Sequence, residues 1–270
     1  MDDDAALEAR GIDRRRLLLL LATGAVTALG GATTLALEQS PSEGKGRPGD
    51  RSRQIPPPRP GAPVVVDRLP PGTNRLALTV DDGYAKPVVD AYVQFARDTG
   101  FHLTFCPNGA YAADWEPHAA TLRRLIGSGQ VQIANHTFNH PDLRRLTPAA
   151  ARSQIVRNEA WINKAFGVTS RPWFRPPYGS DNRDTDAIAG ELGFTRILMW
   201  SGDLGDAYPI RAGTLLRNAR RTINAGAIVL GHANHPTVTH LYEQLVSLIR
   251  ERNLTPSTLD EAFGTSRTVG

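Results

Sequence analysis

Carboxylate and imidazole side chains gather at two places in this sequence. Asp81 and Asp82 are adjacent, and His136 and His140 are separated by three residues. One carboxylate and two imidazoles leave a coordination position open on a divalent ion, which is the ligand pattern of catalytic zinc sites. An ion held in this way makes its bound water more acidic. We therefore expect Asp82, His136 and His140 to bind the metal, although His-x-x-x-His alone is also compatible with an exposed helix face or a turn.

The neighbouring Asp81 is expected to act as a general base. Adjacent residues of a strand point to opposite sides, so both aspartates reach one site only if the chain turns sharply there. Gly83 follows them and provides that backbone freedom. Asp81 is then placed to take a proton from the water. The alternative is a turn that merely ends a strand.

Three further ionisable residues complete the candidate chemistry. Arg175 is expected to pair with Asp81 and fix it as a carboxylate, since a nearby cation favours the charged form. His232 is a candidate general acid that would protonate a leaving amine. An acidic partner would keep His232 charged, with Asp206 expected in this role and Asp203 as the alternative.

The elements that must position these groups alternate between strands and helices. Strands are expected at 74–80, 102–106, 130–135, 172–175, 195–200, 227–231 and 254–256, and helices at 86–99, 117–128, 148–166, 185–192, 214–224 and 238–252. This α/β order predicts parallel strands covered by helices, in a barrel or a strongly curved sheet. The candidate residues follow strand ends, and in a parallel barrel those ends converge on one face. They are therefore expected to form one site.

The segment before these elements has a different composition. Arg14, Arg15 and Arg16 precede an apolar run, which is the layout of an export signal, and arginines directly before leucines fit the twin-arginine type. We assign residues 1–38 to this signal or to a membrane anchor, and cleavage stays open. Residues 39–63 are a linker rich in Pro and Gly. Residues 64–270 form the catalytic domain.

The overall composition excludes several classes of protein. The 270 residues are 40% hydrophobic and 21% charged, unlike a disordered chain or a polytopic membrane protein. The net charge of +4 and the lack of a concentrated basic face argue against nucleic-acid binding. Cys106 is the only cysteine, which excludes an intramolecular disulfide and a cysteine-based zinc cluster. A bound metal must therefore use histidine and carboxylate ligands.

The candidate residues resemble the motifs of the polysaccharide deacetylase family, which has a NodB-homology domain and is carbohydrate esterase family 4. The matching segments, in the family's order, are Thr79-Val80-Asp81-Asp82-Gly83, His136-Thr137-Phe138-Asn139-His140, Arg175-Pro176-Pro177-Tyr178 and Leu230-Gly231-His232. This resemblance implies a distorted (β/α) barrel of about seven parallel strands. It spans roughly residues 74–263.

The resemblance also implies roles for single residues. It implies that Asp81 is the general base, that Arg175 orients Asp81 and that His232 is the general acid. It also implies that Tyr178 forms a side of the substrate groove and that Leu230 lines the acetyl pocket. The fourth motif departs from the family pattern, because Asp206 precedes Ala207 where the family has tryptophan. Trp200 and Tyr208 lie close to Asp206 in the sequence, and Trp200 is also expected to bind substrate. The shape of the acetyl pocket, and with it the substrate, stays open.

The function expected from the resemblance is a metal-dependent hydrolase that removes N-acetyl groups from a cell-wall or extracellular polysaccharide. Peptidoglycan or a chitin-like polymer is the expected substrate. Zinc is the expected ion, with cobalt or another divalent ion as an alternative. The protein is expected to be secreted or anchored to the outer face of the bacterial cytoplasmic membrane, and no protein partner is implied. Other readings are an O-acetyl esterase, an amidase acting on a small non-sugar amide, a catalytically inactive glycan-binding wall protein, and an iron oxygenase site.

Overall fold

The computed structural model describes residues 63–265. The expected export signal and nearly all of the linker therefore lie outside the described residues, as do the last five residues of the chain. Within 63–265, none of the helices combines the length and apolar character needed to cross a membrane.

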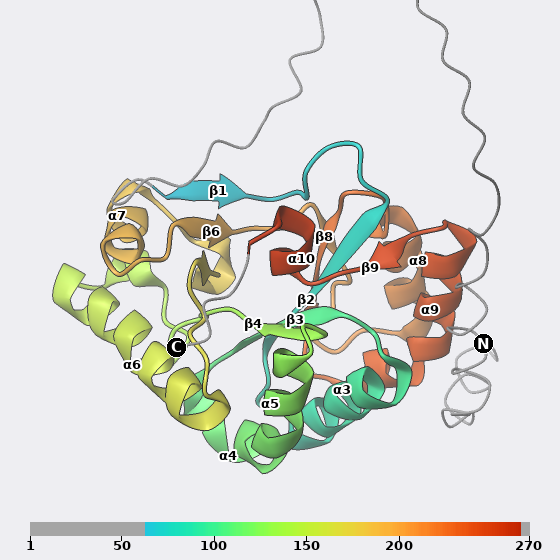
Figure 1. The fold of residues 1–270 in the computed structure, drawn as a ribbon, viewed down its shortest axis with the longest axis horizontal. Helices are drawn as coiled ribbons and strands as arrows, with labels where there is room; N and C mark the ends of the chain where they lie inside the picture. Colours follow the sequence, from blue (N-terminus) through green and yellow to red (C-terminus); the bar gives the residue numbers. More distant parts are fainter. Residues whose placement is uncertain (1–62, 266–270) are drawn as a thin grey trace, which may run out of the picture.

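Parallel strands form two sheets at the centre of the molecule (Figure 1). The larger sheet has the order β4-β3-β2-β8-β7, with β9 also paired to β2, and the smaller has the order β1-β6-β5. Their bounds are β1 Val64–Val66, β2 Arg75–Asp82, β3 Leu103–Pro107, β4 Val131–Ile133, β5 Trp173–Phe174, β6 Arg196–Leu198, β7 Gly202–Asp203, β8 Ile228–His232 and β9 Thr255–Pro256. A parallel bridge between Asn135 and Phe174 links the two sheets. Beyond β6, the backbone N–H of Ser201 donates to the carbonyl oxygen of Ile228, which links them again.

The strands enclose a small apolar interior of the kind that fills a barrel. Seven of them, or the residues next to them, contribute one buried side chain each to one cluster: Val66, Ala77, Cys106, Ala134, Trp173, Leu198 and Ile228. Along β2, Leu76, Leu78 and Val80 instead pack with the helices outside, as the two-residue period of a strand requires. Asp81 shares the inward face with Ala77. The parallel α/β fold expected from the sequence is therefore confirmed, as a distorted barrel assembled from two sheets.

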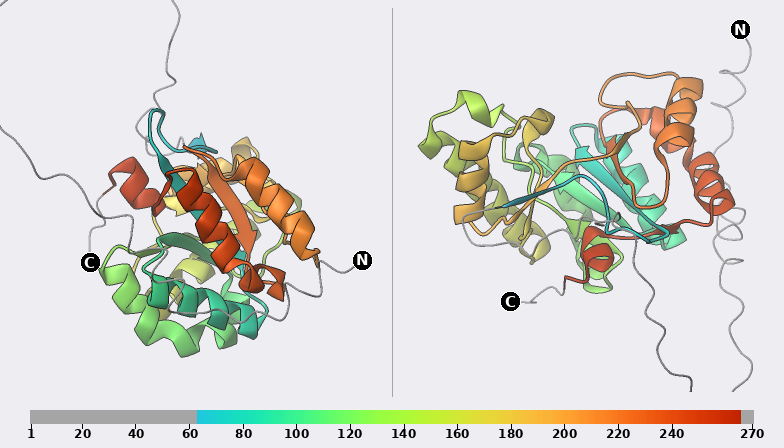
Figure 2. Two further views of the ribbon diagram at one scale, coloured as in Figure 1. Left: turned by 90° about the vertical axis from the view of Figure 1, so that its right-hand side faces the viewer. Right: turned by 90° about the horizontal axis from the view of Figure 1, so that it is seen from above.

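Helices cover the outside of this strand core (Figures 1 and 2). The bounds are α3 Lys86–Thr99, α4 Ala112–Trp115, α5 Ala119–Gly127, α6 Pro148–Phe166, α7 Arg183–Glu191, α8 Ala212–Thr222, α9 Tyr242–Glu251 and α10 Leu259–Phe263. Seen from above, α6 and α7 lie on one side of the strands and α8 and α9 on the other. The limits expected for α3 and α6 are confirmed to the residue. The Thr147 side chain accepts a hydrogen bond from the Ala150 backbone N–H at the start of α6, and Gly167 ends it at φ 73°.

Several short elements differ from the expectation. The β2 strand continues two residues past Val80, where the expected strand ended. The expectation was too short because the last two positions of the strand are the polar Asp81 and Asp82, which break the apolar pattern. Two further strands, β1 and β7, were not expected: β1 is three valines directly after the proline-rich stretch, and β7 is a Gly-Asp pair. The expected helix 117–128 is divided, since a 3₁₀ turn at Glu116–His118 precedes α5. A 3₁₀ helix at Pro236–His240 likewise precedes α9.

Candidate active site

The predicted chemical groups meet at the carboxyl ends of the strands. The two aspartates end β2, His136 comes three residues after β4, Arg175 directly follows β5, and His232 ends β8. All five of these side chains are buried. Asp81 and His232 are register partners on the adjacent strands β2 and β8, so the expected base and acid are neighbours across the sheet.

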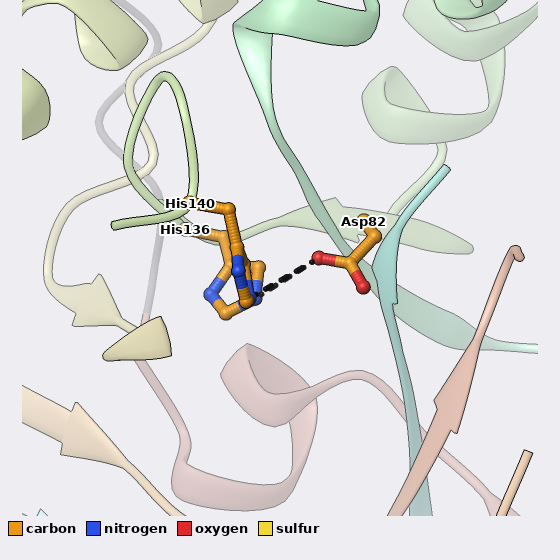
Figure 3. A group of neighbouring side chains, drawn as sticks. All are labelled: Asp82, His136 and His140. Atoms are coloured by element: carbon orange, nitrogen blue, oxygen red, sulfur yellow. Dashed lines mark ion pairs between the residues drawn. The ribbon is translucent and has the colours of Figure 1, made fainter. Parts of the chain in front are cut away.

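Asp82, His136 and His140 form a compact group with one potential ligand atom each, all within 4.8 Å of one another (Figure 3). His136 Nδ1 donates to the backbone carbonyl of Arg175 at 2.7 Å, which leaves Nε2 available. The Nε2 atoms of His136 and His140 lie 3.4 and 3.5 Å from Asp82 Oδ1. This oxygen is buried and has no hydrogen-bond partner among the described residues. An orphaned carboxylate oxygen facing two imidazole nitrogens fits a divalent cation of the zinc type.

The electrostatics of this group favour the protonation states that metal binding requires. Burial lowers the pKa of His140 to about 4, and the neighbouring His136 acts in the same direction. Burial alone would raise the pKa of Asp82, but the interactions with His136 and His140 outweigh it and hold that pKa well below its usual value. A neutral imidazole and an ionised carboxylate are the forms that ligate a metal.

The turn after β2 begins one residue earlier than Gly83. Asp82 itself has φ 68°, in the left-handed region that non-glycine residues seldom adopt, and Gly83 follows at φ 97°. A Cβ on Gly83 would lie 2.3 Å from Nε1 of Trp115, and this nitrogen donates to the Asp82 backbone carbonyl at 3.1 Å. The predicted sharp turn is therefore present, and the indole closes over it. His140 also has a positive φ, of 56°, and strained backbone of this kind is enriched at functional sites.

Arg175 is enclosed by acceptors on every side of its guanidinium. Nη1 donates to both carboxylate oxygens of Asp81, at 2.9 and 2.8 Å. Nη2 donates to Thr79 Oγ1 at 2.9 Å, and Nε donates to the Leu198 carbonyl at 2.7 Å. Thr79 and Asp81 are alternate residues on the inner face of β2, so the strand geometry presents both to the same guanidinium. This network fixes the orientation of Asp81.

His232 is held by Asp206. Its Nδ1 lies 3.0 Å from Asp206 Oδ1, and both side chains are buried. Burial lowers the pKa of His232, but the hydrogen bond to Asp206 and the charge of Asp81 outweigh it and raise that pKa to about 9. Asp203, the alternative partner, accepts instead from the backbone N–H of Gly205 at 2.6 Å. The geometry therefore selects Asp206 over Asp203.

The three residues expected to contact substrate lie in different surroundings. Tyr178 is 68% exposed, has φ 61°, and sets its ring edge-on to the His140 ring, with centroids 4.5 Å apart. Leu230 is buried two residues before His232 on β8, on the same face of that strand. Trp200 is half-buried, with its ring 5.3 Å from the Arg175 guanidinium carbon. Trp200 thus packs beside the arginine network, while Tyr178 stands at the rim.

Two asparagines that support the site were not predicted. Asn234 Nδ2 donates to Asp82 Oδ2 at 2.7 Å, and its Oδ1 accepts from the Gly83 N–H at 3.3 Å. Asn108 Nδ2 donates to the backbone carbonyl of His136 at 2.6 Å and so anchors the histidine loop. Asn234 follows the end of β8 by two residues, and the same strand-end rule that located His232 could have included it. Asn108 directly follows the end of β3 and could have been found in the same way.

Known proteins match this chain over most of the described region. The model of a family described as polysaccharide deacetylase matches residues 68–197. An uncharacterized protein of Streptomyces coelicolor is 31% identical over 78% of this chain and 79% of its own. A chitooligosaccharide deacetylase of a Bradyrhizobium species is 31% identical over 61% of this chain and 73% of its own. The peptidoglycan-N-acetylglucosamine deacetylase PgdA of Listeria monocytogenes is 26% identical over 77% of this chain, but the match spans only 43% of that relative's length.

A solved structure supports the fold independently. A CE4 family pseudoenzyme from Bacillus anthracis superposes with a TM-score of 0.66 at 21% identity, covering 77% of this chain and 71% of its own. At this level of identity the likeness concerns the fold alone. Together with the matching family model and the relatives at 31% identity, it leads to one conclusion: the chain belongs to the polysaccharide deacetylase family.

Proposed function

We propose that this chain is a metal-dependent hydrolase that removes N-acetyl groups from a polymer of N-acetylglucosamine and releases acetate. Peptidoglycan or a chitin-like glycan is the proposed substrate. One observation carries the proposal: a buried carboxylate held by an arginine and a buried imidazole held by a carboxylate stand on adjacent strands, beside a three-residue metal group.

Asp82, His136 and His140 are the residues that would hold a divalent ion, zinc being the proposed one. When bound, such an ion supplies an acidified water and polarises the acetyl carbonyl. Asp81 accepts the proton of the attacking water at one of its carboxylate oxygens. Arg175 keeps this carboxylate in place through the bonds to both of its oxygens. The backbone N–H of Tyr178 is proposed to stabilise the negative charge that develops on the acetyl oxygen.

His232 carries out the second proton transfer. Because Nδ1 is engaged with Asp206, the proton to be donated is on Nε2. With a pKa of about 9, the imidazole is protonated at neutral pH. It therefore gives its Nε2 proton to the departing nitrogen as the carbon–nitrogen bond breaks, so that the sugar leaves as a neutral amine and the acetyl group as acetate. Leu230, two residues earlier on the same face of β8, is proposed to contact the acetyl methyl group, and Trp200 and Tyr178 to contact the sugar.

The names of the relatives support the choice of substrate. They include chitooligosaccharide deacetylases of rhizobia and peptidoglycan-N-acetylglucosamine deacetylases of Listeria monocytogenes and Bacillus cereus. The proposed location is outside the cytoplasm, by secretion or by anchorage to the outer face of the membrane. The twin arginines and apolar run of residues 1–38 support this location, with 39–63 as a tether to the catalytic domain.

A catalytically inactive, glycan-binding protein is the alternative that one observation favours, since a structural neighbour is described as a pseudoenzyme. The present chain has every acid, base and metal-ligand position filled, which supports turnover. The two functions are separated by a direct assay.

The test measures acetate release by the zinc-loaded full chain from N-acetylglucosamine oligomers, peptidoglycan and acetylated xylan, with a chelated sample as control. Release from the first or second polymer that stops on chelation is expected. Release from xylan alone would assign an O-acetyl esterase instead. Glycan binding with no acetate from any polymer would overturn the proposal in favour of the inactive protein.

A further inference from the structure

A hollow of about 710 Å³ lies next to the metal group. Its lining includes Asp142, Arg144, Arg145, Tyr178 and Ser180. The proposed chemistry does not use Asp142, Ser180 or either arginine.

The turn that carries the two arginines is fixed in place. It is a 3₁₀ turn, Leu143–Arg145, and its first residue, Leu143, is buried in an apolar cluster that includes Phe174 of β5. Asp142 precedes the turn and caps it, since its Oδ1 accepts from the Arg144 backbone N–H at 3.1 Å. The arginines are thus carried by a turn that is anchored before any ligand arrives.

The charges in the hollow do not cancel. Asp142 Oδ2 lies 3.4 Å from Arg145 Nε, and Asp142 Oδ1 also accepts from Ser180 Oγ at 2.9 Å. Among the described residues, the Arg144 guanidinium reaches only Ser180 Oγ, at 3.5 Å. Within residues 63–265, no carboxylate lies within ion-pairing distance of Arg144. The hollow therefore has one positive charge in excess, on a group with several free donors.

This hollow is connected to the reaction centre through one side chain. The Tyr178 ring contacts His140 on one side and lines the hollow on the other. Asp142 is two residues after His140, so the same loop supplies a metal ligand and the wall of the hollow. A polymer with its acetyl group at the metal group and its chain across Tyr178 would enter the hollow with its next units.

We propose that the hollow binds an anionic substituent, a carboxylate or a phosphate, on the polymer that is deacetylated. The guanidinium fork of Arg144 matches the oxygens of either group. Arg145 is 86% exposed and paired with Asp142, so it contributes less than Arg144 to the binding of the anion. The inference rests on the proposed function and narrows it: acidic glycans are preferred to neutral oligomers of N-acetylglucosamine.

The test compares the zinc-loaded full chain with its Arg144→Gln variant on neutral N-acetylglucosamine oligomers and on soluble peptidoglycan fragments with free carboxylates. Binding is measured by calorimetry, and kcat/KM by acetate release. Two further samples separate the ligand sources: fragments whose carboxylates have been amidated, and fragments that carry wall phosphate polymers. Arg217→Gln, at an arginine of α8 that donates to Thr214, is the matched control.

We expect Arg144→Gln to weaken binding and kcat/KM for the acidic fragments about fivefold, as the loss of an exposed charge pair does, and to leave the neutral oligomers unchanged. Added salt should weaken the binding of the acidic fragments to the wild type more than their binding to the variant. If amidation of the fragments removes their tighter binding to the wild type, the bound substituent is a carboxylate. If only the fragments with wall phosphate polymers bind more tightly, the substituent is a phosphate.

Two results would overturn the inference: wild-type binding of the acidic fragments that is no tighter than that of the neutral oligomers, or equal losses on both in the variant. Because binding is measured separately from turnover, a chain that released no acetate would refute the proposed function, and the binding comparison would still decide the role of the hollow.

Discussion

The centre of the site and its rim are built on opposite principles. In the centre, Asp81, Arg175 and His232 are buried, and each is held by at least one charged partner from another strand end. At the rim, Tyr178 and Arg144 are exposed and have few polar contacts of their own. The centre is thus organised in advance for one reaction, as electrostatic catalysis requires. The rim has side chains available to bind a substrate, and substitutions there should affect selectivity more than rate.

The largest effect is expected for Asp81→Asn in the centre. The amide can still accept a hydrogen bond from Arg175 but cannot take a proton, so kcat should fall about 10²- to 10⁴-fold. Metal affinity should be nearly unchanged, because Asp82, His136 and His140 are retained. Acetate release and metal titration measure the two quantities. The control is Asp90→Asn on α3, which removes a half-buried partner of Lys86 and His118 outside the site and should leave both quantities intact. Normal turnover in Asp81→Asn would refute its role as the base.

A smaller effect is expected for Asn234→Ala, which tests the support around the metal group. The amide donates to Asp82 Oδ2, the oxygen that does not face the histidines. Loss of such a supporting hydrogen bond typically weakens metal affinity about 10- to 100-fold. Competition with a fluorescent chelator measures the affinity. Asn224→Ala, at an exposed asparagine bonded to the Arg221 carbonyl, is the control. An unchanged zinc affinity would mean that Asn234 only shapes the loop.

The next prediction concerns pH. In its proposed role as the general acid, His232 must be protonated, so kcat/KM of the wild type should fall as the pH rises through about 9. In Asp206→Asn the carboxylate that raises this pKa is gone, and the fall should move toward the ordinary histidine pKa of 6.5. At pH 8 the variant should therefore be roughly tenfold slower, with a smaller deficit at pH 6.

The same shift affects stability. The folded pKa of His232 lies above its unfolded value, so its contribution to stability is complete below about pH 6.5 and is lost as the pH rises through about 9. Chemical denaturation measures the free energy of unfolding across this pH range, and this free energy should decrease less in Asp206→Asn than in the wild type.

The kinetic comparison decides the role of Asp206. If kcat/KM of the wild type and of Asp206→Asn falls at the same alkaline pH, Asp206 does not tune His232.

The sequence predicts the centre much better than its supports. The catalytic candidates were found because they are ionisable residues directly after apolar strands, and parallel strands bring such positions together. Thr79 lies inside β2 and not after its end, so this rule does not reach it. Asn234 does follow a strand end, but the rule was restricted to ionisable residues, and an asparagine in a loop is ordinary. Only the fold shows that Thr79 contacts an arginine 96 residues away, and Asn234 an aspartate 152 residues away.

The fold shows the same contrast between local and distant signals. The residues that start and stop helix α6 are adjacent to the helix in the sequence: Thr147-Pro148 at its start and Gly167 directly after its end. Helix α10 has a capping box between Thr258 and Glu261 that could have predicted it. Strand β1 has no such local signal: its three valines become a strand only by pairing with β6, about 130 residues later in the chain.

The smallest effect is expected at the rim, for Tyr178→Ala. Its ring makes one edge contact with His140 and is otherwise mostly exposed, so it can contact a sugar without holding the centre together. Loss of one aromatic contact is worth about 0.5–1.5 kcal/mol, which raises KM for a polymer roughly 2- to 10-fold. The value of kcat and the metal affinity should change little. Val156→Ala removes an exposed apolar side chain from α6, on the outer surface, and serves as the control. A loss in kcat as large as that of Asp81→Asn would place Tyr178 in the centre and erase the distinction between the two regions.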